Sequence, residues 1–252
     1  MVKFEDYKNR FKYVRLERQD GILEVTLHRD GGPAIWEANE GGIHDEVGEA
    51  FYWIGRDRET KVIILTGAGD TFIDRMDLGD GPLMITPAFW DRIFKEGRDL
   101  LMNLLDIEVP IVGAVNGNAY IHAELLVLSD IVIAADHARF ADKAHAPGGV
   151  APADGVHVIW PMLLGPNRGR HFLLTGAEID AAEAQRLGFV AEVLPKQRLK
   201  ARAWEIAREL AAKPQLMLRY TRVSTTQHIK RRLLDDLGYG LALEGLGAMG
   251  MG

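Results

Sequence analysis

The sequence predicts an α/β fold, and three observations lead to that class. Three runs are apolar throughout, at residues 62–65, 111–115 and 131–135. A strand without a polar face is covered on both sides, as in the parallel sheets of α/β proteins. The segments between these runs have helical periodicity, and after about residue 165 the strand pattern nearly disappears. We therefore expect a core of sheets and helices followed by a helical C-terminal third.

The individual elements follow from local patterns. The first strand is expected at residues 22–28, where apolar and polar side chains alternate and indicate one exposed face. The strongest helix is predicted from Pro87 to Ile107, with Thr86 as its cap. Further helices are predicted at residues 168–174, 179–187, 198–212 and 215–243. The Gly/Met tail at 245–252 is expected to be frayed.

The composition excludes several classes of function. Lys and Arg number 30 against 36 Asp and Glu, and this net charge of −6 disfavours nucleic acid as the main partner. No apolar run approaches the ~18 residues of a membrane span, and the acidic, aromatic start does not resemble a signal peptide. Cysteine is absent and neither serine lies in a G-x-S-x-G turn, which excludes covalent thiol or serine catalysis. We expect a cytoplasmic protein without membrane or nucleic-acid partners.

The most distinctive histidine lies in a stretch rich in glycine, proline and alanine, residues 142–155. This stretch contains His145 and, nine positions later, Asp154. If the loop folds back, a carboxylate on one imidazole nitrogen leaves the other nitrogen as a general base. Alternatively, His145 is an ordinary loop histidine and Asp154 is the N-cap of a helix that begins near Gly155, a position at which aspartate is favoured.

Other candidates are less specific. His122 and Glu124 lie between a buried strand and an apolar helix, where they are costly unless they form a core pair or have a function. Trp36 and His44 flank a polar, glycine-bearing segment that could border a pocket. Glu244 is a single acid on an apolar stripe, for which a helix-surface position is the ordinary explanation. No histidine pair has zinc-ligand spacing, so no metal site is predicted.

A basic segment gives one further indication. Residues 196–232 contain 11 Lys and Arg but only two acids. Solvated helix faces are the simplest explanation, and a phosphate-rich ligand such as coenzyme A is the functional alternative. The glycines at 67–69 lack the third glycine of a dinucleotide-binding loop, so a plain turn is expected there.

Three separated segments are similar to one known family: residues 62–72, 109–117 and 173–181. In order and spacing, the sequence resembles the crotonase (enoyl-CoA hydratase/isomerase) superfamily over about residues 15–245. The resemblance implies a crotonase-type ββα superhelix, or spiral, as the core over residues 1–195. It further implies a helical C-terminal trimerisation region at 196–252, with assembly as homotrimers or as hexamers built from two trimers.

The sequence departs from CoA-handling members of this family where they bind the thioester. Residues 74–77 read Asp-Arg-Met-Asp where those members carry Ala-Gly-Ala-Asp, and residues 120–124 replace a triple glycine. Small residues let a thioester carbonyl approach the oxyanion-hole amides, so larger ones oppose that mode of binding. His145 aligns with the second catalytic glutamate of hydratases, which removes their glutamate pair.

The same departures resemble the β-diketone hydrolase branch, typified by oxocamphor hydrolase. The similar positions are Trp36, His44, Glu244 and the segments 142–145, 150–155, 158–161 and 165–176. The branch implies retro-Claisen hydrolysis of a C–C bond in a (bi)cyclic 1,3-diketone, which gives a keto acid without cofactor or metal. The expected partner is therefore a small-molecule diketone.

The resemblance also implies roles for individual residues. His145 and Asp154 would activate water at one carbonyl, while His122 and Trp36 would bind the carbonyl whose enolate leaves. Two supporting catalytic groups are expected, His44 and Glu244. Three substrate contacts are expected, Met76, Leu83 and Trp90.

Two other functions stay open at this point. The basic segment and Glu124 favour a CoA-dependent hydratase or isomerase. A non-catalytic crotonase-fold scaffold is the second alternative, although a net charge of −6 weighs against an RNA-binding member.

Overall fold

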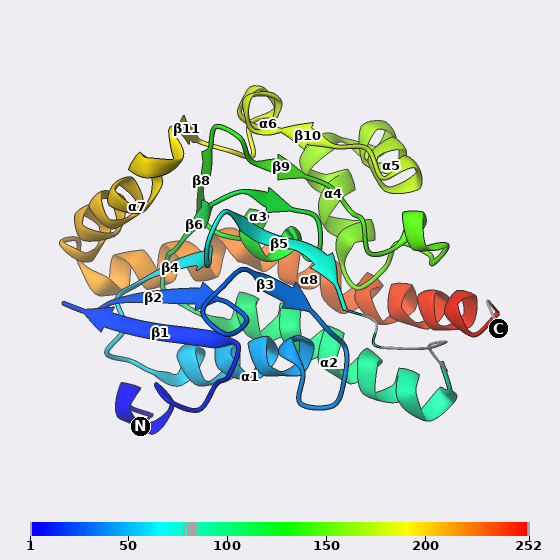
Figure 1. Cartoon of the computed structure of the whole chain (residues 1–252). Helices are drawn as coiled ribbons and strands as arrows, with labels where there is room; N and C mark the ends of the chain where they lie inside the picture. Colours follow the sequence, from blue (N-terminus) through cyan, green and yellow to red (C-terminus); the bar gives the residue numbers. More distant parts are fainter. Residues whose placement is uncertain (1, 78, 80–84, 251–252) are drawn as a thin grey trace.

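A computed structural model of the chain describes residues 2–77, 79 and 85–250, and its mixed sheets and helices confirm the α/β class. The larger sheet has six strands: β1 (Val14–Gln19), β2 (Ile22–Leu27), β4 (Val62–Gly67), β6 (Ile111–Val115), β8 (Ile131–Ala135) and β11 (Glu192–Leu194). They are hydrogen-bonded in the order β1-β2-β4-β6-β8-β11 (Figure 1). Every neighbouring pair except β1–β2 is parallel.

The smaller sheet has five short strands: β3 (Ala34–Trp36), β5 (Thr71–Met76), β7 (Asn118–Ala119), β9 (Arg139–Phe140) and β10 (Ile179–Asp180). Their order is β10-β9-β7-β5-β3, and only the β9–β10 pair is antiparallel. Each of β3, β5 and β7 follows a strand of the larger sheet in the chain. The plain turn predicted around the glycines at 67–69 is confirmed, since residues 68–70 connect β4 to β5.

The described helices are η1 (Phe4–Asp6), α1 (Ile43–Arg56), α2 (Pro87–Asp106), α3 (Glu124–Val127), η2 (Ala146–Gly148), α4 (Val156–Leu164), α5 (Pro166–Thr175), α6 (Ala181–Leu187), α7 (Lys196–Ala211) and α8 (Gln215–Met249). Along the chain, a strand of the larger sheet, a strand of the smaller sheet and a helix recur as β2-β3-α1, β4-β5-α2 and β6-β7-α3. This recurrence is the ββα spiral that the resemblance implies. None of the described helices is both long enough and apolar enough to span a membrane.

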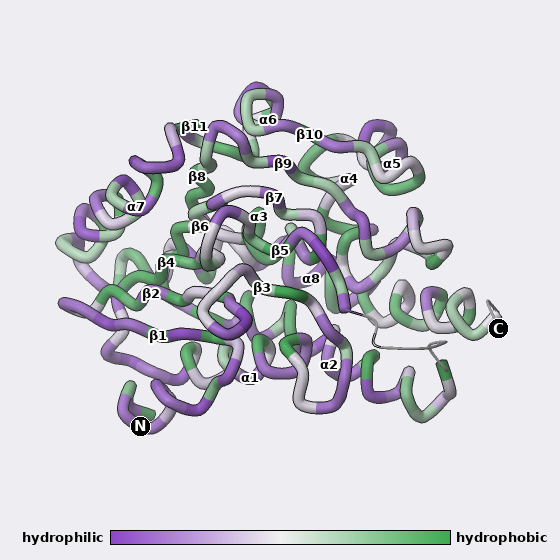
Figure 2. The backbone as a smooth tube through the Cα atoms, in the orientation of Figure 1, coloured by the Kyte–Doolittle hydropathy of each residue, from purple (hydrophilic) through white to green (hydrophobic). Residues whose placement is uncertain are grey.

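The buried strands and the main helix lie where the sequence predicts them. The strands β6 and β8 are hydrophobic along their length (Figure 2) and almost fully buried. The helix α2 begins at Pro87, and the Thr86 hydroxyl accepts a hydrogen bond from the Phe89 amide at 3.1 Å. The predicted cap of α2 is therefore confirmed.

The prediction that β2 has one exposed polar face is wrong. Glu24 and Thr26 are each only 3% exposed, because α7 packs across this face of the sheet. Lys200 and Trp204 of α7 donate hydrogen bonds to the Glu24 carboxylate, at 2.7 and 2.8 Å. Their positions, far along the chain, explain why local alternation could not reveal the cover.

Two helix boundaries also differ from the prediction. Residues 179–180 form β10, because Ile179 pairs with Phe140 and Asp180 caps α6 by accepting from the Glu183 amide at 2.8 Å. The prediction of a frayed tail from residue 245 is wrong up to Met249, because α8 continues to that residue and packs against α2. The predicted division at residues 195 and 196 coincides with the start of α7, and the two-region description stays a prediction.

A buried arginine fastens α8 to the rest of the core. Arg222 is 1% exposed and donates from Nε to the Ile107 carbonyl at 2.7 Å and from Nη2 to the Leu104 carbonyl at 3.2 Å. These carbonyls lie at the C-terminal end of α2, where backbone acceptors lack intrahelical partners. Its charge is paired with Asp130, whose carboxylate also accepts the Ile111 amide at 2.7 Å. One side chain therefore joins α8, α2 and the start of β6.

Replacing Asp130 with asparagine is expected to lower the free energy of unfolding by about 3 kcal/mol, because it leaves the Arg222 charge buried without a counter-ion. Urea denaturation followed by circular dichroism measures the loss. The matched control is Asp236→Asn, which breaks the exposed Arg232–Asp236 pair on α8 and should cost less than about 1 kcal/mol. Equal losses in the two variants would contradict this role of Arg222.

Candidate active site

The predicted site residues surround one cavity of about 200 Å³. Eight of the nine line it, namely Trp36, His44, Met76, Trp90, His122, His145, Asp154 and Glu244. They come from β3, α1, β5, α2, α8 and the segments that precede α3 and α4. The ninth, Leu83, lies outside the described residues. The fold thus gathers side chains that are up to about two hundred positions apart in the sequence.

Two site residues have an uncommon backbone conformation. His122 and Asp154 have φ angles of +49° and +46°, in the left-handed region that few residues other than glycine adopt. Gly155 follows with φ +98°, and a Cβ atom there would lie 2.2 Å from the Leu101 side chain of α2. The chain can therefore approach α2 closely, and Asp154 reaches the cavity. Such strain persists where surrounding structure holds it and is typical of functional sites.

The capping alternative for Asp154 is wrong. Gly155 is the N-cap residue of α4, and no side chain caps that helix. The Asp154 Oδ1 atom is buried and has no hydrogen-bond partner among the described residues. The ordinary explanations for His145 and Glu244 are also wrong, because both side chains are buried at the cavity rather than exposed on a loop or a helix surface.

Three buried histidines are each held through Nδ1 by a carboxylate. The pairs are His44 with Glu96 at 2.8 Å, His122 with Glu124, and His145 with Asp142 at 2.7 Å. A bond at one ring nitrogen fixes the orientation of the imidazole and leaves the other nitrogen for further partners. The pairing alternative for His122 and Glu124 is thus confirmed, and the same histidine also lines the cavity.

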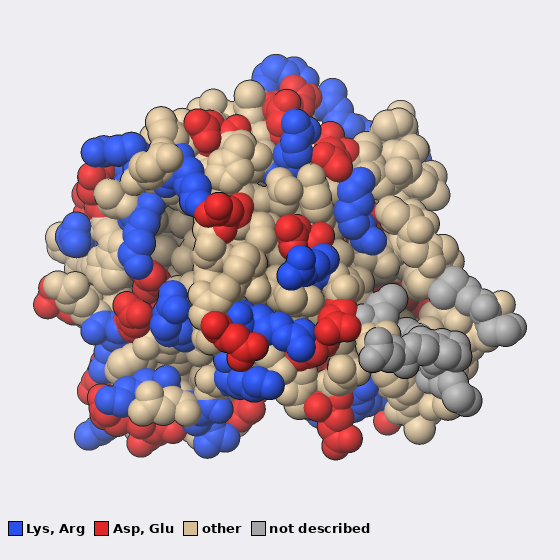
Figure 3. All heavy atoms as spheres, viewed as in Figure 1, with Lys and Arg blue, Asp and Glu red and all other residues tan. Residues whose placement is uncertain are grey.

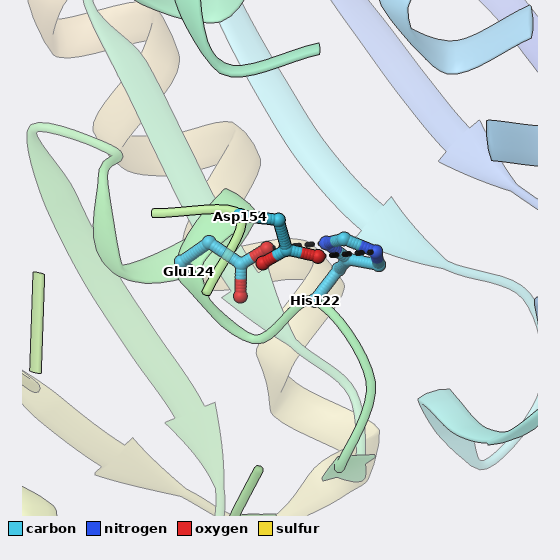
Figure 4. Close-up of side chains that lie close together, drawn as sticks. All are labelled: His122, Glu124 and Asp154. Atoms are coloured by element: carbon cyan, nitrogen blue, oxygen red, sulfur yellow. Dashed lines mark hydrogen bonds and ion pairs between the residues drawn. The ribbon is translucent and has the colours of Figure 1, made fainter. Parts of the chain in front are cut away.

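A shared carboxylate connects two of these rings. Asp154 Oδ2 lies 3.7 Å from Nε2 of His122 and 3.5 Å from Nε2 of His145. Figure 4 shows the carboxylates of Asp154 and Glu124 both directed toward the His122 ring. Glu244 Oε1 lies 3.4 Å from the same His145 nitrogen. The structure therefore brings Asp154 beside His145, but the carboxylate on the opposite ring nitrogen is Asp142, which the sequence analysis did not single out.

The charges of the site perturb its pKa values. Burial lowers the pKa of His145, but the charge of Asp154 and the hydrogen bond with Asp142 outweigh burial and hold that pKa well above 6.5. Burial likewise lowers the pKa of His122, but the charges of Glu124 and Asp154 outweigh burial, so the pKa lies above its ordinary value. Burial raises the pKa of Asp154, and the two histidines reverse that effect, so its pKa lies below the ordinary value.

The pKa of Glu244 is shifted in the opposite direction from that of Asp154. Burial, together with the negative charge of Asp154, raises the pKa of Glu244 to about 7 despite its contact with His145. Groups that interact this strongly lose their protons in steps whose pKa values belong to the set and not to any single residue. His145, Asp154 and Glu244, called the proton-accepting cluster below, therefore form one titrating unit, and His145 is not an isolated neutral base.

The remaining walls of the cavity differ in character. The centroid of the Trp36 ring lies 4.1 Å from that of His122, with the ring planes tilted by 43°, and 5.6 Å from that of His44, which gives one wall of imidazole and indole groups. Trp90 donates its Nε1–H to the Leu241 carbonyl at 2.9 Å, and a Cβ at Gly245 would overlap its ring at 2.2 Å. The other wall is largely apolar and includes Met76, Ile85, Phe89, Trp90, Ile93, Val150 and Ala248.

Two groups of side chains have ligand atoms close enough to hold a metal ion. They are His122 with Glu124 and Asp154, and His145 with Asp154 and Glu244, with all ligand atoms of each group within 4.8 Å of one another. Spacing along the sequence did not predict them, because their members come from four separate segments. In both groups the carboxylates already serve as counter-ions for the imidazoles.

Sequence reasoning missed two of the three carboxylates that orient the histidines. Asp142 stands three positions before His145 inside a motif that the resemblance includes, so its spacing could have indicated the pair. Glu96 lies on α2, 52 positions after His44, and gives no local signal. Only a folded chain places it beside α1.

The basic segment 196–232 is largely neutralised by the chain itself. Lys200 pairs with Glu24, Arg202 with Glu192, Arg219 with Glu108, Arg222 with Asp130 and Lys230 with Asp106. On the face drawn in Figure 3, basic and acidic side chains are interspersed. These contacts explain the basic composition of the segment without a phosphate-rich ligand.

Comparisons with known proteins identify the family. The family model described as enoyl-CoA hydratase/isomerase matches residues 17–239. The chain belongs to the enoyl-CoA hydratase/isomerase family, the crotonase superfamily. Two relatives, both named carnitinyl-CoA dehydratase, are 34% identical (Citrobacter koseri) and 35% identical (Salmonella arizonae). They cover 77% and 78% of this chain and 72% and 74% of their own lengths.

Solved structures of the family extend this similarity to nearly the whole chain. A β-diketone hydrolase from the cyanobacterium Anabaena sp. PCC 7120, bound to (S)-3-oxocyclohexyl acetic acid, is 44% identical over 98% of both chains, with a TM-score of 0.93. An enoyl-CoA hydratase/isomerase from Mycobacterium paratuberculosis is 25% identical over 96% of this chain and 95% of its own, with a TM-score of 0.87. Family members with different named activities thus share this fold.

The two aspartates near His145 are expected to affect the histidines differently. In Asp154→Asn, the pKa values of His122 and His145 should both fall, because Asp154 raises both. In Asp142→Asn, the pKa of His145 should fall more than that of His122, because Asp142 bonds only to His145. NMR titration of the histidine ring protons measures both. An Asp154→Asn variant in which neither pKa falls would contradict the shared-carboxylate geometry.

Proposed function

We propose that this family member is a hydrolase that cleaves a C–C bond of a (bi)cyclic 1,3-diketone and releases a keto acid. The observation that carries the proposal is the arrangement of His122 and His145 around Asp154 in a cavity whose other wall is apolar. The 44% identity to a β-diketone hydrolase over nearly the full length supports the same substrate class. The reaction requires only water, so we propose that it needs no cofactor or metal.

The proton-accepting cluster would perform the first step. A water molecule beside Nε2 of His145 attacks one carbonyl and transfers a proton to the cluster. With one proton shared between them, the two residues can exist in two forms. Either His145 is protonated and Glu244 is ionised, or His145 is neutral and Glu244 is protonated. Either form of the coupled set can therefore take part. General-base assistance of this kind contributes ~10²–10⁴-fold to a rate.

The imidazole and indole wall would stabilise the leaving enolate. Collapse of the tetrahedral intermediate breaks the C–C bond and leaves the electron pair on the other carbonyl fragment. Trp36 and His122 line the cavity together and would donate hydrogen bonds to that oxygen. A raised pKa keeps His122 able to donate near neutral pH. One such donor is worth about 3–4 kcal/mol to an oxyanionic transition state.

A CoA-dependent hydratase or dehydratase is the second candidate. The relatives named carnitinyl-CoA dehydratase and the buried Glu124 favour it. Against it, the Glu124 carboxylate is bonded to His122, and the side chains of Met76 and His122 line the cavity where the family resemblance places small residues. The pairing of the basic segment within the chain also weakens the argument for a bound phosphate.

We also propose that the protein assembles as a homotrimer or as a dimer of trimers. Large apolar side chains are exposed along α8, which the resemblance assigns to trimerisation, and Leu216, Tyr220, Leu234, Tyr239 and Leu246 are each at least 60% exposed. An apolar surface of this kind is typical of a contact between subunits.

The proposed reaction predicts activity on a non-enolisable bicyclic 1,3-diketone and none on crotonyl-CoA. Keto-acid formation and loss of the enoyl absorbance are followed in parallel with the purified protein. His145→Ala and Asp154→Asn should each lower diketone cleavage by at least about 10²-fold, with nearly unchanged melting temperatures. His171→Ala, which removes an exposed histidine of α5, is the control. Turnover of crotonyl-CoA with an inert diketone would favour the second candidate instead.

The cluster also predicts how the rate depends on pH. It must lose a proton before it can accept one from water, and the pKa of Glu244 is raised to about 7. Diketone cleavage should therefore increase with pH and reach half its maximum near pH 7. In Glu244→Gln this inflection should move, because an amide does not titrate in this range and His145 must then lose its own proton before it can act as the base. An identical inflection in that variant would show that Glu244 does not contribute to the titrating unit.

A further inference from the structure

A histidine–carboxylate pair lies at the cavity outside the proton-accepting cluster. His44 Nδ1 is 2.8 Å from Glu96 Oε2, and the two side chains are only 5% and 6% exposed. Arg92, one helical turn before Glu96 on α2, donates from Nη1 to Glu96 Oε1 at 2.8 Å. The three side chains form a continuous chain from the surface of α2 to the cavity. The first step of the proposed reaction does not use them.

The buried carboxylate of this chain is ionised near neutral pH. Burial raises the pKa of Glu96, but hydrogen bonds with His44 and Arg92 outweigh burial and give a net decrease. An ionised carboxylate on Nδ1 stabilises positive charge on the imidazole ring. Glu96 therefore fixes the orientation of the His44 ring through Nδ1.

Arg92 also fixes the segment that leads into α1. Its Nη2 donates to the Ala38 carbonyl at 2.7 Å, and Ala38 lies in the connection between β3 and α1. The same connection contains Glu37, whose carbonyl accepts a 3.4 Å hydrogen bond from the His44 amide. The helix α2 thus holds both the His44 ring and the backbone that carries it.

The surroundings of His44 differ from those of the other two histidines. Nε2 of His122 and Nε2 of His145 both lie near the Asp154 carboxylate. For His44, the only ion pair found in the described part of the chain is the one at Nδ1. Its ring centroid lies 5.6 Å from Trp36 and 5.8 Å from His122, the two proposed enolate donors. A proton on the cavity side of His44 is therefore close to the place where the enolate would form.

We propose that His44 is the catalytic acid that returns a proton to the enolate carbon, and that Glu96 and Arg92 are its positioning residues. The proposal rests on the proposed diketone cleavage. After the C–C bond breaks, the electron pair of the enolate takes the Nε2 proton of His44 and forms the new C–H bond of the ketone. The ring becomes neutral, and the carboxylic acid product or the solvent supplies the next proton. The net products are the keto acid anion and one proton.

A ring that is fixed at Nδ1 delivers its proton to one face of the enolate. Loss of Glu96 would allow the ring to turn. The enolate would then persist longer and take its proton from water on either face. Stereochemistry at the new C–H bond is consequently a more specific readout than rate alone.

The test is cleavage in D₂O of a bicyclic diketone that places the new C–D bond at a stereocentre. NMR spectroscopy of the product gives the ratio of the two epimers. The wild-type protein should incorporate one deuterium on a single face. In Glu96→Gln, kcat should fall by about 10²-fold with little change in KM, and both epimers should form. Glu96→Asp, which keeps the charge, should restore part of the selectivity.

Two further variants make the result specific. His44→Asn keeps a hydrogen-bond donor for Glu96 but removes the proposed catalytic acid. Like Glu96→Gln, this variant should form both epimers of the product. The matched control is Asp99→Asn, which breaks the exposed Lys95–Asp99 pair on the same helix and should retain full rate and selectivity. Unchanged selectivity in both Glu96→Gln and His44→Asn would overturn the proposal. Absence of any cleavage by the wild-type protein would instead overturn the proposed function on which it rests.

Discussion

The mutual compensation of buried charges is the constraint on which the site depends. An isolated ion in a protein interior costs several kilocalories per mole, and that cost is reduced only by a close, hydrogen-bonded partner. Here three imidazoles and a set of carboxylates from separate elements compensate one another around one cavity. Removing one member changes the pKa values of the others, because the contacts that pair the charges also tune their protonation.

The backbone of the core accommodates this cluster at specific points. His122 and Asp154 adopt left-handed conformations, and Gly155 permits contact with Leu101 of α2. The helices α2 and α8 then close two sides of the cavity, fastened to each other through Trp90 and Arg222. The spiral of parallel strands supplies a rigid support, while His122, His145 and Asp154 lie in the connections between elements, where functional residues of α/β proteins are common.

The same fold carries different named activities among its relatives, so function must be argued from the site. The carboxylate of Glu124 illustrates this point, because its environment decides its role. Bonded to His122, it orients that imidazole and raises its pKa.

The sequence alone determined the α/β class, the buried strands, the start of α2 and, through the family resemblance, eight of the residues that line the cavity. Local periodicity and residue type carry that information, and the resemblance placed His145 and Asp154 in one site. Only the tertiary structure decided which carboxylate faces which ring nitrogen, that Glu24 is covered by α7, and that Glu96 supports His44. The contacts of Glu24 and Glu96 join positions far apart in the chain, and pairing at such separations leaves no trace in local pattern, whereas Asp142 lies only three positions before His145. The electrostatics of the site therefore emerged only once the chain had folded.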